Sequence, residues 1–406
     1  MSQVDLGARR EVRVGESHDT RDVLRNARRQ AVERGLDDVL IVDVDAHHYE
    51  TESWGELSEY IEDPLIRHQN DAGGVTGLRG GAAGLLFPQI GNQDISGRIT
   101  RYRLRGLEQW EQDGDQRDTV LVRRAMDMLG IDYQVLFPTP MLSLGLHPQT
   151  EIEVALARAY ARWLGERVLP QEPRIKSLLF LPFSTPEAAL RLVEDFADTP
   201  GVVGFMVTAT RFRPIHHNAY LPVYRAIEER GMSLGFHAGY AWYGDRALES
   251  LNRFMSVHAI GFVQHHLVHM TNWVVNGMPE RFPNLDVIWI ESGLAWLPFL
   301  MQRLDHEYEM RTSEAPLLRR LPSEYMREMY YTSQPMERSN LEALEMTFKM
   351  IDAPNRLLYS SDYPHWDFDV PSVIYDLPFL DEQAKRNILG ATAQRLFDLP
   401  PLRAEK

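Results

Sequence analysis

The feature of this sequence that most constrains its fold is a regular alternation of short apolar runs with longer helical patterns. Runs that are almost continuously apolar, such as 177–181 and 287–290, are typical of parallel strands buried on both faces. Eight runs of this kind occur, at 39–45, 133–139, 176–183, 202–210, 233–240, 285–292, 330–334 and 357–362.

The segments between these runs carry helical spacing and helix-boundary signals. Thr185 and Pro186 open one helix with a cap and a first-turn proline, and Gly231 ends another. Helical patterns cover 151–169, 186–196, 221–230, 295–310, 340–351 and 381–396. Eight strands alternating with helices predict an α/β protein, a closed (β/α)8 TIM barrel. The alternative is an open doubly wound sheet, but no glycine-rich phosphate loop follows the first run.

Two segments lie outside the alternation. We expect residues 1–38 to form an N-terminal helical arm and residues 39–400 to form the barrel domain. The barrel would carry a long insertion at 51–117, after its first strand. A long loop at the mouth of a barrel is often a lid or a substrate-binding element. The total of 406 residues suits one barrel with such additions.

Composition excludes several classes of function. The chain has no cysteine, which rules out disulfides, thiolate metal sites and a cysteine nucleophile, so any metal must be held by histidine and carboxylate. A net charge of −15 argues against non-specific nucleic-acid binding. The N-terminus lacks a signal-peptide pattern, and the longest apolar run, 287–300, contains Glu291, so we expect a cytoplasmic enzyme without a membrane span.

Metal-ligating residues stand where four of the predicted strands end. Active sites of such barrels lie at the carboxyl ends of the strands, and alternate residues of a strand point to the same side. These strand ends therefore predict one metal centre. Its expected ligands are Asp45, His47, His237, Glu291 and Asp362.

Further candidates surround this set. Asp362 is also the first candidate for an acid–base residue, and Glu50 and His365 are further catalytic candidates. We expect Asp43 to make a supporting hydrogen bond and His48 to point away from His47.

A second histidine cluster lies on the helix predicted after the fifth strand. His266 and His269 are three residues apart, and His265 and His269 are four apart, so each pair shares a helix face. His266 and His269 are therefore candidate ligands for a second metal. The alternative is a polar helix face at the rim of the site.

These positions resemble the amidohydrolase superfamily, in particular the branch that includes the aminocarboxymuconate and resorcylate decarboxylases. That branch carries a His-x-His or similar pair on strand one, a histidine on strands five and six, and an aspartate on strand eight. The most specific local match is the segment from Ser361 to His365, with the sequence Ser-Asp-Tyr-Pro-His. The corresponding residues here are Asp45, His47, His237, Glu291 and Asp362.

The sequence departs from this pattern in three places. Asp45 stands where many members have histidine, and Glu291 stands where the decarboxylases have histidine. No lysine occurs in 204–210, the run that would supply the carbamylated lysine of the binuclear hydrolases. Together these departures argue against simple amide hydrolysis.

The chain also resembles a smaller group on the same barrel, the nonheme diiron oxygenases, which includes an enzyme of the platensimycin–platencin antibiotic pathway. This resemblance implies two iron ions, O2, and a CoA-linked or terpenoid acyl substrate that is hydroxylated. Sulfur-free ligand sets suit iron, manganese and zinc alike. Arg98, Arg101 and Arg103 are candidate substrate-binding residues for the phosphates of a CoA thioester, unless they form the polar side of an edge strand.

The leading hypothesis from the sequence is therefore a nonheme diiron monooxygenase. The alternative is a mononuclear zinc or manganese hydrolase or decarboxylase, with Asp362 as its acid–base residue. A third hypothesis is a non-catalytic binding barrel that keeps part of a metal site. The charged N-terminal arm is compatible with a homodimer.

Overall fold

The computed structural model describes residues 20–68, 114–208, 213–239, 248–251, 254–365 and 367–401. Within these residues, eight parallel strands are hydrogen-bonded side by side in the order of the sequence. The strands are β1 (Val42–His48), β2 (Tyr133–Pro138), β3 (Ile175–Phe180), β4 (Val202–Val207), β5 (Ser233–His237), β6 (Val287–Ile290), β7 (Tyr330–Thr332) and β8 (Leu357–Leu358).

Backbone hydrogen bonds close the ring between β1 and the segment that follows β8. The amide of Val44 donates to the carbonyl of Tyr359 over 2.9 Å, and the amide of Asp362 donates to the carbonyl of Asp45 over 2.7 Å. These bonds complete a (β/α)8 barrel, so the predicted fold is confirmed.

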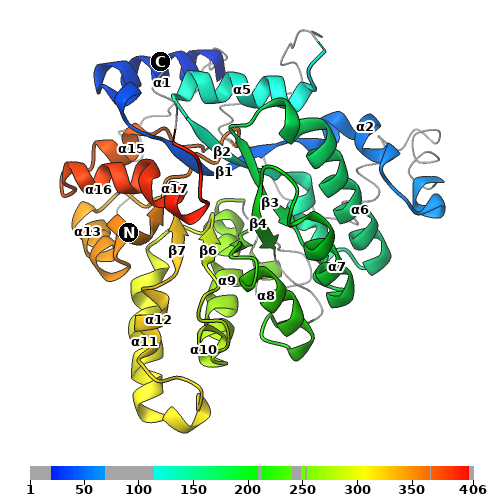
Figure 1. The fold of residues 1–406 in the computed structure, drawn as a ribbon. Coiled ribbons are helices and arrows are strands. Elements are labelled where there is room, and N and C mark those ends of the chain that lie inside the picture. The colour runs from blue at the N-terminus through cyan, green and yellow to red at the C-terminus, as the bar shows by residue number, and fades with distance from the viewer. Residues whose placement is uncertain are drawn as a thin grey trace, which may run out of the picture.

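Helices surround the strands, as Figure 1 shows. Most strands are followed by a helix that packs its apolar face on the barrel, as parallel strands require. The longer helices are α1 (Thr20–Glu33), α5 (Arg117–Leu129), α6 (Thr150–Trp163), α7 (Pro186–Phe196), α8 (Leu221–Glu228), α9 (Phe254–Val275), α11 (Trp296–Met310) and α13 (Leu341–Met350). The shorter helices are α2 (Trp54–Glu59), α10 (Met278–Arg281), α12 (Pro322–Met326), α14 (Ala353–Arg356), α15 (Ser372–Tyr375), α16 (Glu382–Arg386) and α17 (Thr392–Leu396).

Two layers of apolar side chains form the core. Inside the barrel, a Cβ at Gly235 would lie 2.8 Å from Cδ1 of Ile290 and 3.0 Å from Cδ2 of Leu178, so only glycine leaves room for these side chains. On the helix-facing side, the rings of Phe236 and Trp289 stack with centroids 4.8 Å apart. Successive residues of β5 therefore face opposite layers, and His237 returns to the inner side.

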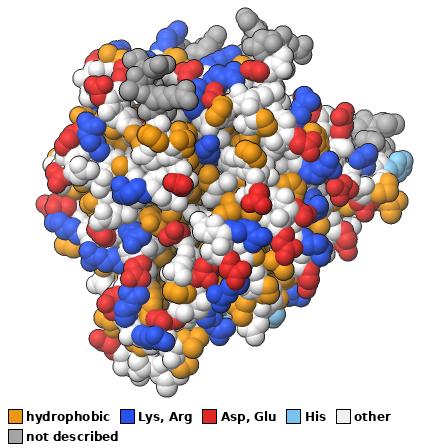
Figure 2. Space-filling view, in the orientation of Figure 1, with side chains coloured by type: hydrophobic (Ala, Val, Ile, Leu, Met, Phe, Trp, Pro, Cys, Tyr) orange, Lys and Arg blue, Asp and Glu red, His pale blue; other side chains and the backbone are white. Residues whose placement is uncertain are grey.

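The N-terminal helix α1 packs along α5, and its C-terminal end is held by an ion pair between Arg34 and Asp376, at 2.6 Å. The division into an arm at 1–38 and a barrel at 39–400 stays a prediction. In the part of the chain described here, no helix is both long and apolar enough to cross a membrane. On the face in Figure 2, basic and acidic side chains are interspersed.

Candidate metal centre

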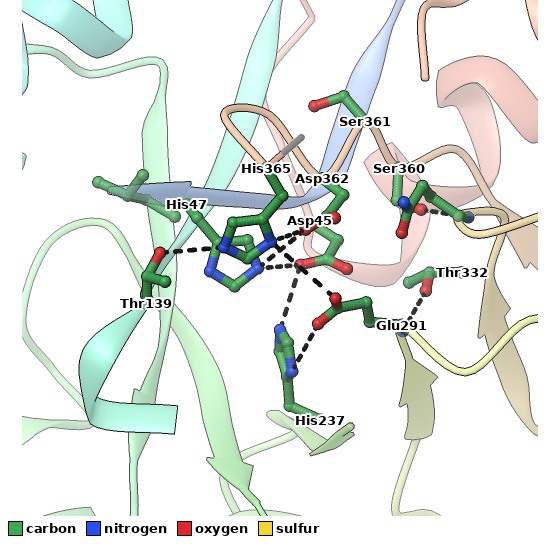
Figure 3. Close-up of polar contacts among 12 residues, drawn as sticks. Asp45, His47, Thr139, His237, Glu291, Thr332, Ser360, Ser361, Asp362 and His365 are labelled. Carbon is green, nitrogen blue, oxygen red and sulfur yellow. Dashed lines mark hydrogen bonds and ion pairs between the residues drawn. The ribbon is translucent and has the colours of Figure 1, made fainter. Parts of the chain in front are cut away.

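The carboxyl end of β1 supplies two of the predicted ligands. Asp45 and His47 are both buried, and their side chains share one side of the strand because they are two residues apart. Nε2 of His47 lies 3.2 Å from Oδ1 of Asp45. The strand therefore places a carboxylate beside an imidazole (Figure 3).

The strand β5 ends on His237, whose ring is oriented by the neighbouring backbone. Nδ1 lies 2.7 Å from the carbonyl oxygen of Ala238. A carbonyl oxygen can only accept, so Nδ1 carries the proton and Nε2 carries the lone pair. Nε2 lies 3.2 Å from Oδ1 of Asp45. His237 thus turns toward Asp45 the nitrogen that a metal would need, in the way that proteins usually fix a metal-binding histidine.

Glu291 and Asp362 enter the centre from strained turns. Each follows a strand and has a left-handed backbone, with φ of 58° and 59°. This conformation costs about 1–2 kcal/mol in a residue other than glycine, and such strain collects at functional sites. Oδ1 of Asp362 lies 3.3 Å from Nε2 of His47, and Oε2 of Glu291 lies 3.5 Å from Nδ1 of His237. The strained turns therefore bring both carboxyl groups against the two histidines.

The spacing of these atoms fits a metal ion. Two ligand atoms bound at about 2.1 Å to one ion lie about 3.0–3.4 Å apart at octahedral or tetrahedral angles. Oδ1 of Asp45 is 3.2 Å from Nε2 of both His47 and His237, which falls within that interval. Among the described residues, potential ligand atoms within 4.8 Å of one another form two overlapping sets. These sets are Asp45, His47, His237 and Glu291, and His47, Glu291, Asp362 and His365.

Unpaired polar atoms point to the same conclusion. Oδ2 of Asp45, Nε2 of His47 and Oε2 of Glu291 are buried and have no hydrogen-bond partner within the described part of the chain. Leaving a buried polar group unpaired costs about 1–3 kcal/mol. A divalent cation between these side chains would give Nε2 of His47 a partner and bring positive charge to the neighbouring carboxyl groups, so the residues present fit a bound metal.

Burial and mutual repulsion set the protonation of the centre. Burial raises the pKa of Asp362 and of Glu291 well above the ordinary range, and their negative neighbours raise it further. Burial alone would also raise the pKa of Asp45, but His237 and His47 outweigh it and hold the pKa at about 2. Burial lowers the pKa of His47 to about 4. At neutral pH Asp45 is therefore ionised, whereas burial disfavours the ionised forms of Glu291 and Asp362.

The two further catalytic candidates have different surroundings. Nδ1 of His365 lies 2.6 Å from Oδ1 of Asp362, so the structure brings His365 into the centre. Glu50 is buried against the loop after β2, where its carboxylate accepts from the amides of Thr139, over 3.1 Å, and Met141, over 2.8 Å. The described contacts of Glu50 are thus with the loop backbone.

The α9 histidines lie in the outer layer. The ring of His266 packs edge-on against Trp289, with centroids 5.2 Å apart, and the ring of His269 lies 5.9 Å from Phe236. Both histidines are buried, and burial lowers the pKa of His269 to about 3 and that of His266 well below its ordinary value. Neither belongs to the two sets of ligand atoms found among the described residues. The structure therefore does not bring these two predicted ligands to the strand ends.

Supporting residues surround the centre. Asp43 accepts hydrogen bonds from Ser361, and the ring of His48 turns away to contact Asp118, at 3.1 Å, and the hydroxyl of Tyr160, at 2.9 Å. Sequence reasoning missed Asp118, Tyr160 and Thr139, whose hydroxyl lies 3.2 Å from Nε2 of His365. The only sequence signal for Thr139 is its place at the end of the second apolar run.

The predicted substrate-binding arginines, Arg98, Arg101 and Arg103, lie outside the described residues, as does most of the insertion. Their role stays a prediction.

A parallel barrel with a buried carboxylate–histidine cluster at its strand ends defines the class of metal-dependent TIM-barrel proteins. Comparison with known proteins narrows that class. The family model described as amidohydrolase matches residues 42–399. The chain belongs to the amidohydrolase family, as the resemblance seen in the sequence implied.

Several of the similar proteins are decarboxylases. The chain is 23% identical over 290 residues to gamma-resorcylate decarboxylase from Polaromonas sp. strain JS666, covering 68% of this chain and 86% of the relative. A dihydroxybenzoic acid decarboxylase from the same organism, with bound manganese and the inhibitor 2-nitroresorcinol, superposes with a TM-score of 0.63 and 20% identity over 89% of this chain and 97% of that one. The 5-carboxyvanillate decarboxylase from Sphingomonas paucimobilis gives a TM-score of 0.61 and 20% identity over 89% of this chain and 100% of that one. At this identity the two structures establish the fold.

These findings contradict the leading hypothesis from the sequence. The curated relatives are decarboxylases, so the predictions of a nonheme diiron monooxygenase, of an oxidoreductase and of a role in antibiotic biosynthesis are wrong. Identity with the platensimycin–platencin enzyme is unsupported. The two-metal prediction counted His266 and His269, which lie outside both ligand sets of the described chain.

A metal cofactor is supported, because the centre fits one and a similar structure holds manganese, but two iron ions are not. Similar proteins bind small molecules, whereas a CoA thioester, O2 and a homodimer have no support in these findings.

Proposed function

We propose that this protein is a metal-dependent decarboxylase that removes CO2 from a small aromatic carboxylic acid without oxygen. The observation that carries the proposal is the buried convergence of Asp45, His47, His237 and Asp362 on a barrel whose relatives are decarboxylases. The metal would be one divalent ion, manganese or zinc, since carboxylate and imidazole ligands suit both.

Asp45, His47, His237 and Asp362 would hold the ion. When bound, a divalent ion supplies positive charge that polarises a carboxylate or a neighbouring hydroxyl oxygen of the substrate. Asp45 and Asp362 balance that charge. His365 holds Asp362 in place through the contact at Nδ1.

Glu291 would carry the proton that the reaction consumes. Loss of CO2 breaks a carbon–carbon bond and leaves the electron pair on the substrate carbon, which must gain one proton. Burial, together with the charge of Asp45, raises the pKa of Glu291 and so favours the protonated form that a proton donor needs. The products are CO2 and a new C–H bond, and water then returns a proton to Glu291.

An aromatic side chain beside the centre supports a flat substrate. Phe137 is buried, and its ring centroid lies 4.9 Å from that of His237 and 5.9 Å from that of His47. Aromatic rings pack well against such a wall. The similar structure with bound 2-nitroresorcinol holds a ligand of this shape.

Metal removal and reloading tests this function. The protein is stripped with a chelator, reloaded with Mn²⁺ or Zn²⁺, and assayed for CO2 release from 2,6-dihydroxybenzoate and 5-carboxyvanillate, with benzoate as a substrate that lacks the hydroxyl group. We expect metal-dependent release from a hydroxylated acid, and at least about 100-fold slower release in Asp362→Asn. Protein that holds one ion per chain but releases CO2 from no hydroxylated aromatic acid would overturn the proposal.

The family to which the chain belongs favours one second candidate, hydrolysis. Asp362 would then accept a proton from the attacking water. The same reloaded protein distinguishes the two reactions, because hydrolysis of an amide or ester without any CO2 release supports the second.

A further inference from the structure

The ring of His365 is held on three sides (Figure 3). Nδ1 lies 2.6 Å from Oδ1 of Asp362, and Nε2 lies 3.2 Å from Oγ1 of Thr139. One face of the ring stacks on His47, with centroids 4.2 Å apart and planes 28° apart. Both ring nitrogens therefore have partners, and the ring plane is fixed as well.

The chemistry of these partners selects one state of the ring. An ionised carboxylate can only accept a hydrogen bond, so beside the carboxylate of Asp362 the proton of His365 sits on Nδ1. Nε2 of the neutral ring is then an acceptor, and the hydroxyl of Thr139 is the donor that faces it. The lone pair on Nε2 is then occupied by the hydroxyl of Thr139.

The loop that carries Thr139 is itself fixed by a buried carboxylate. The amide of Thr139 donates to Oε2 of Glu50, over 3.1 Å, and to the carbonyl of His48, over 3.0 Å. The amide of Met141 donates to Oε1 of Glu50, over 2.8 Å. Glu50 therefore clamps the turn on both sides of Pro140, and the hydroxyl of Thr139 has little freedom to leave His365.

We propose that Thr139 is a positioning residue that holds Nε2 of His365, so that His365 orients Asp362 and stays out of the metal's ligand set. Only the expected effect of Thr139 on turnover rests on the proposed function. The hydrogen bond itself is independent of the reaction, and it assigns Glu50 a role in holding the Thr139 loop.

Nitrogen NMR of histidine-labelled protein tests the hydrogen bond directly. The His365 signals are assigned by their loss in His365→Gln, in zinc-loaded protein or, if zinc does not bind, in metal-free protein. We expect Thr139→Val to move the Nε2 signal of His365 toward a ring nitrogen without a hydrogen bond, and Thr139→Ser to restore it. The matched control is Thr347→Val, which removes a threonine hydroxyl elsewhere, bonded to the carbonyl of Ala343 on α13. An Nε2 signal that is unchanged in Thr139→Val, or changed equally by Thr347→Val, overturns the inference.

Turnover supplies the second measurement. With a substrate that the wild-type protein decarboxylates, Thr139→Val should lower kcat about fivefold, the effect of one lost hydrogen bond, with KM changed less than about twofold. Thr139→Ser should recover most of kcat. A rise in KM without a change in kcat would contradict a positioning role. If the wild type decarboxylates nothing, the proposed function fails while the NMR result still decides the role of Thr139.

Discussion

Asp43 on the first strand accepts two hydrogen bonds from Ser361, which follows the last strand. The backbone amide of Ser361 lies 2.8 Å from Oδ1, and its hydroxyl lies 2.5 Å from Oδ2. Nε2 of Gln134 donates to Oδ2 over 3.0 Å. Asp43 therefore ties together the two chain segments that carry Asp45 and Asp362.

Replacing Asp43 with asparagine should weaken this connection. The new side-chain amide would offer a donor where Ser361 and Gln134 already donate, so we expect the free energy of unfolding to fall by about 1–3 kcal/mol. Urea unfolding measures the change. The control is Asp37→Asn, whose partner Arg28 is a half-exposed residue. Equal stability of the two variants would contradict the role given to Asp43.

The fold and most residues of the metal centre could be predicted from the sequence, for identifiable physical reasons. Apolar runs and helical spacing report burial directly, and the position of His237 at a strand end already places it at the mouth of a barrel. Helical spacing puts His266 and His269 on one face of the helix. It does not show whether that face packs on the outside of the barrel or reaches the strand ends. The contact between Thr139 and His365 joins two loops 226 residues apart, so no local pattern could reveal it.

Removing the charge of Asp45 should remove the metal. Its Oδ1 faces both His47 and His237, and Asp45→Asn keeps the shape of the side chain while losing the negative charge. We expect metal bound per chain, measured by mass spectrometry after dialysis, to fall about tenfold or more. Asp195→Asn, on an exposed ion pair with Arg158, is the control and should bind as the wild type does. Full metal occupancy in Asp45→Asn would mean that the ion is held elsewhere.

Replacing His266 should leave the metal in place. Its ring is buried against Trp289, and both ring nitrogens lack hydrogen-bond partners among the residues described here. His266→Leu removes a buried polar group without a partner, so the free energy of unfolding should stay equal or rise. Metal content and urea unfolding are measured on the same preparation. Loss of metal in this variant would show that His266 is a metal ligand after all.

Glu153 on α6 should make the stability of the protein depend on pH. Burial raises the pKa of this carboxyl group from an ordinary 4.5 to about 7. The folded protein keeps a proton that the unfolded chain releases, so this contribution is complete below pH 4.5 and is lost as the pH rises through 7. The slope is at most about 1.4 kcal/mol per pH unit for one such group.

Urea unfolding between pH 5 and pH 8 measures this slope. Glu153→Gln cannot titrate, so its free energy of unfolding should fall less steeply over that interval than that of the wild type. If the free energy of unfolding changed with pH in parallel for the two proteins, Glu153 would not be the source of the pH dependence.

The central claim, metal-dependent decarboxylation without oxygen, is tested most directly by one comparison. Manganese-loaded protein is incubated with a hydroxylated aromatic acid, once in air and once under strict exclusion of oxygen. The rates of formation and the amounts of CO2 and of the decarboxylated product are measured in both conditions. We expect equal rates in the two conditions, one CO2 for each product molecule, and no release after the metal is removed. A rate that disappears without oxygen, or that survives complete removal of the metal, would contradict it.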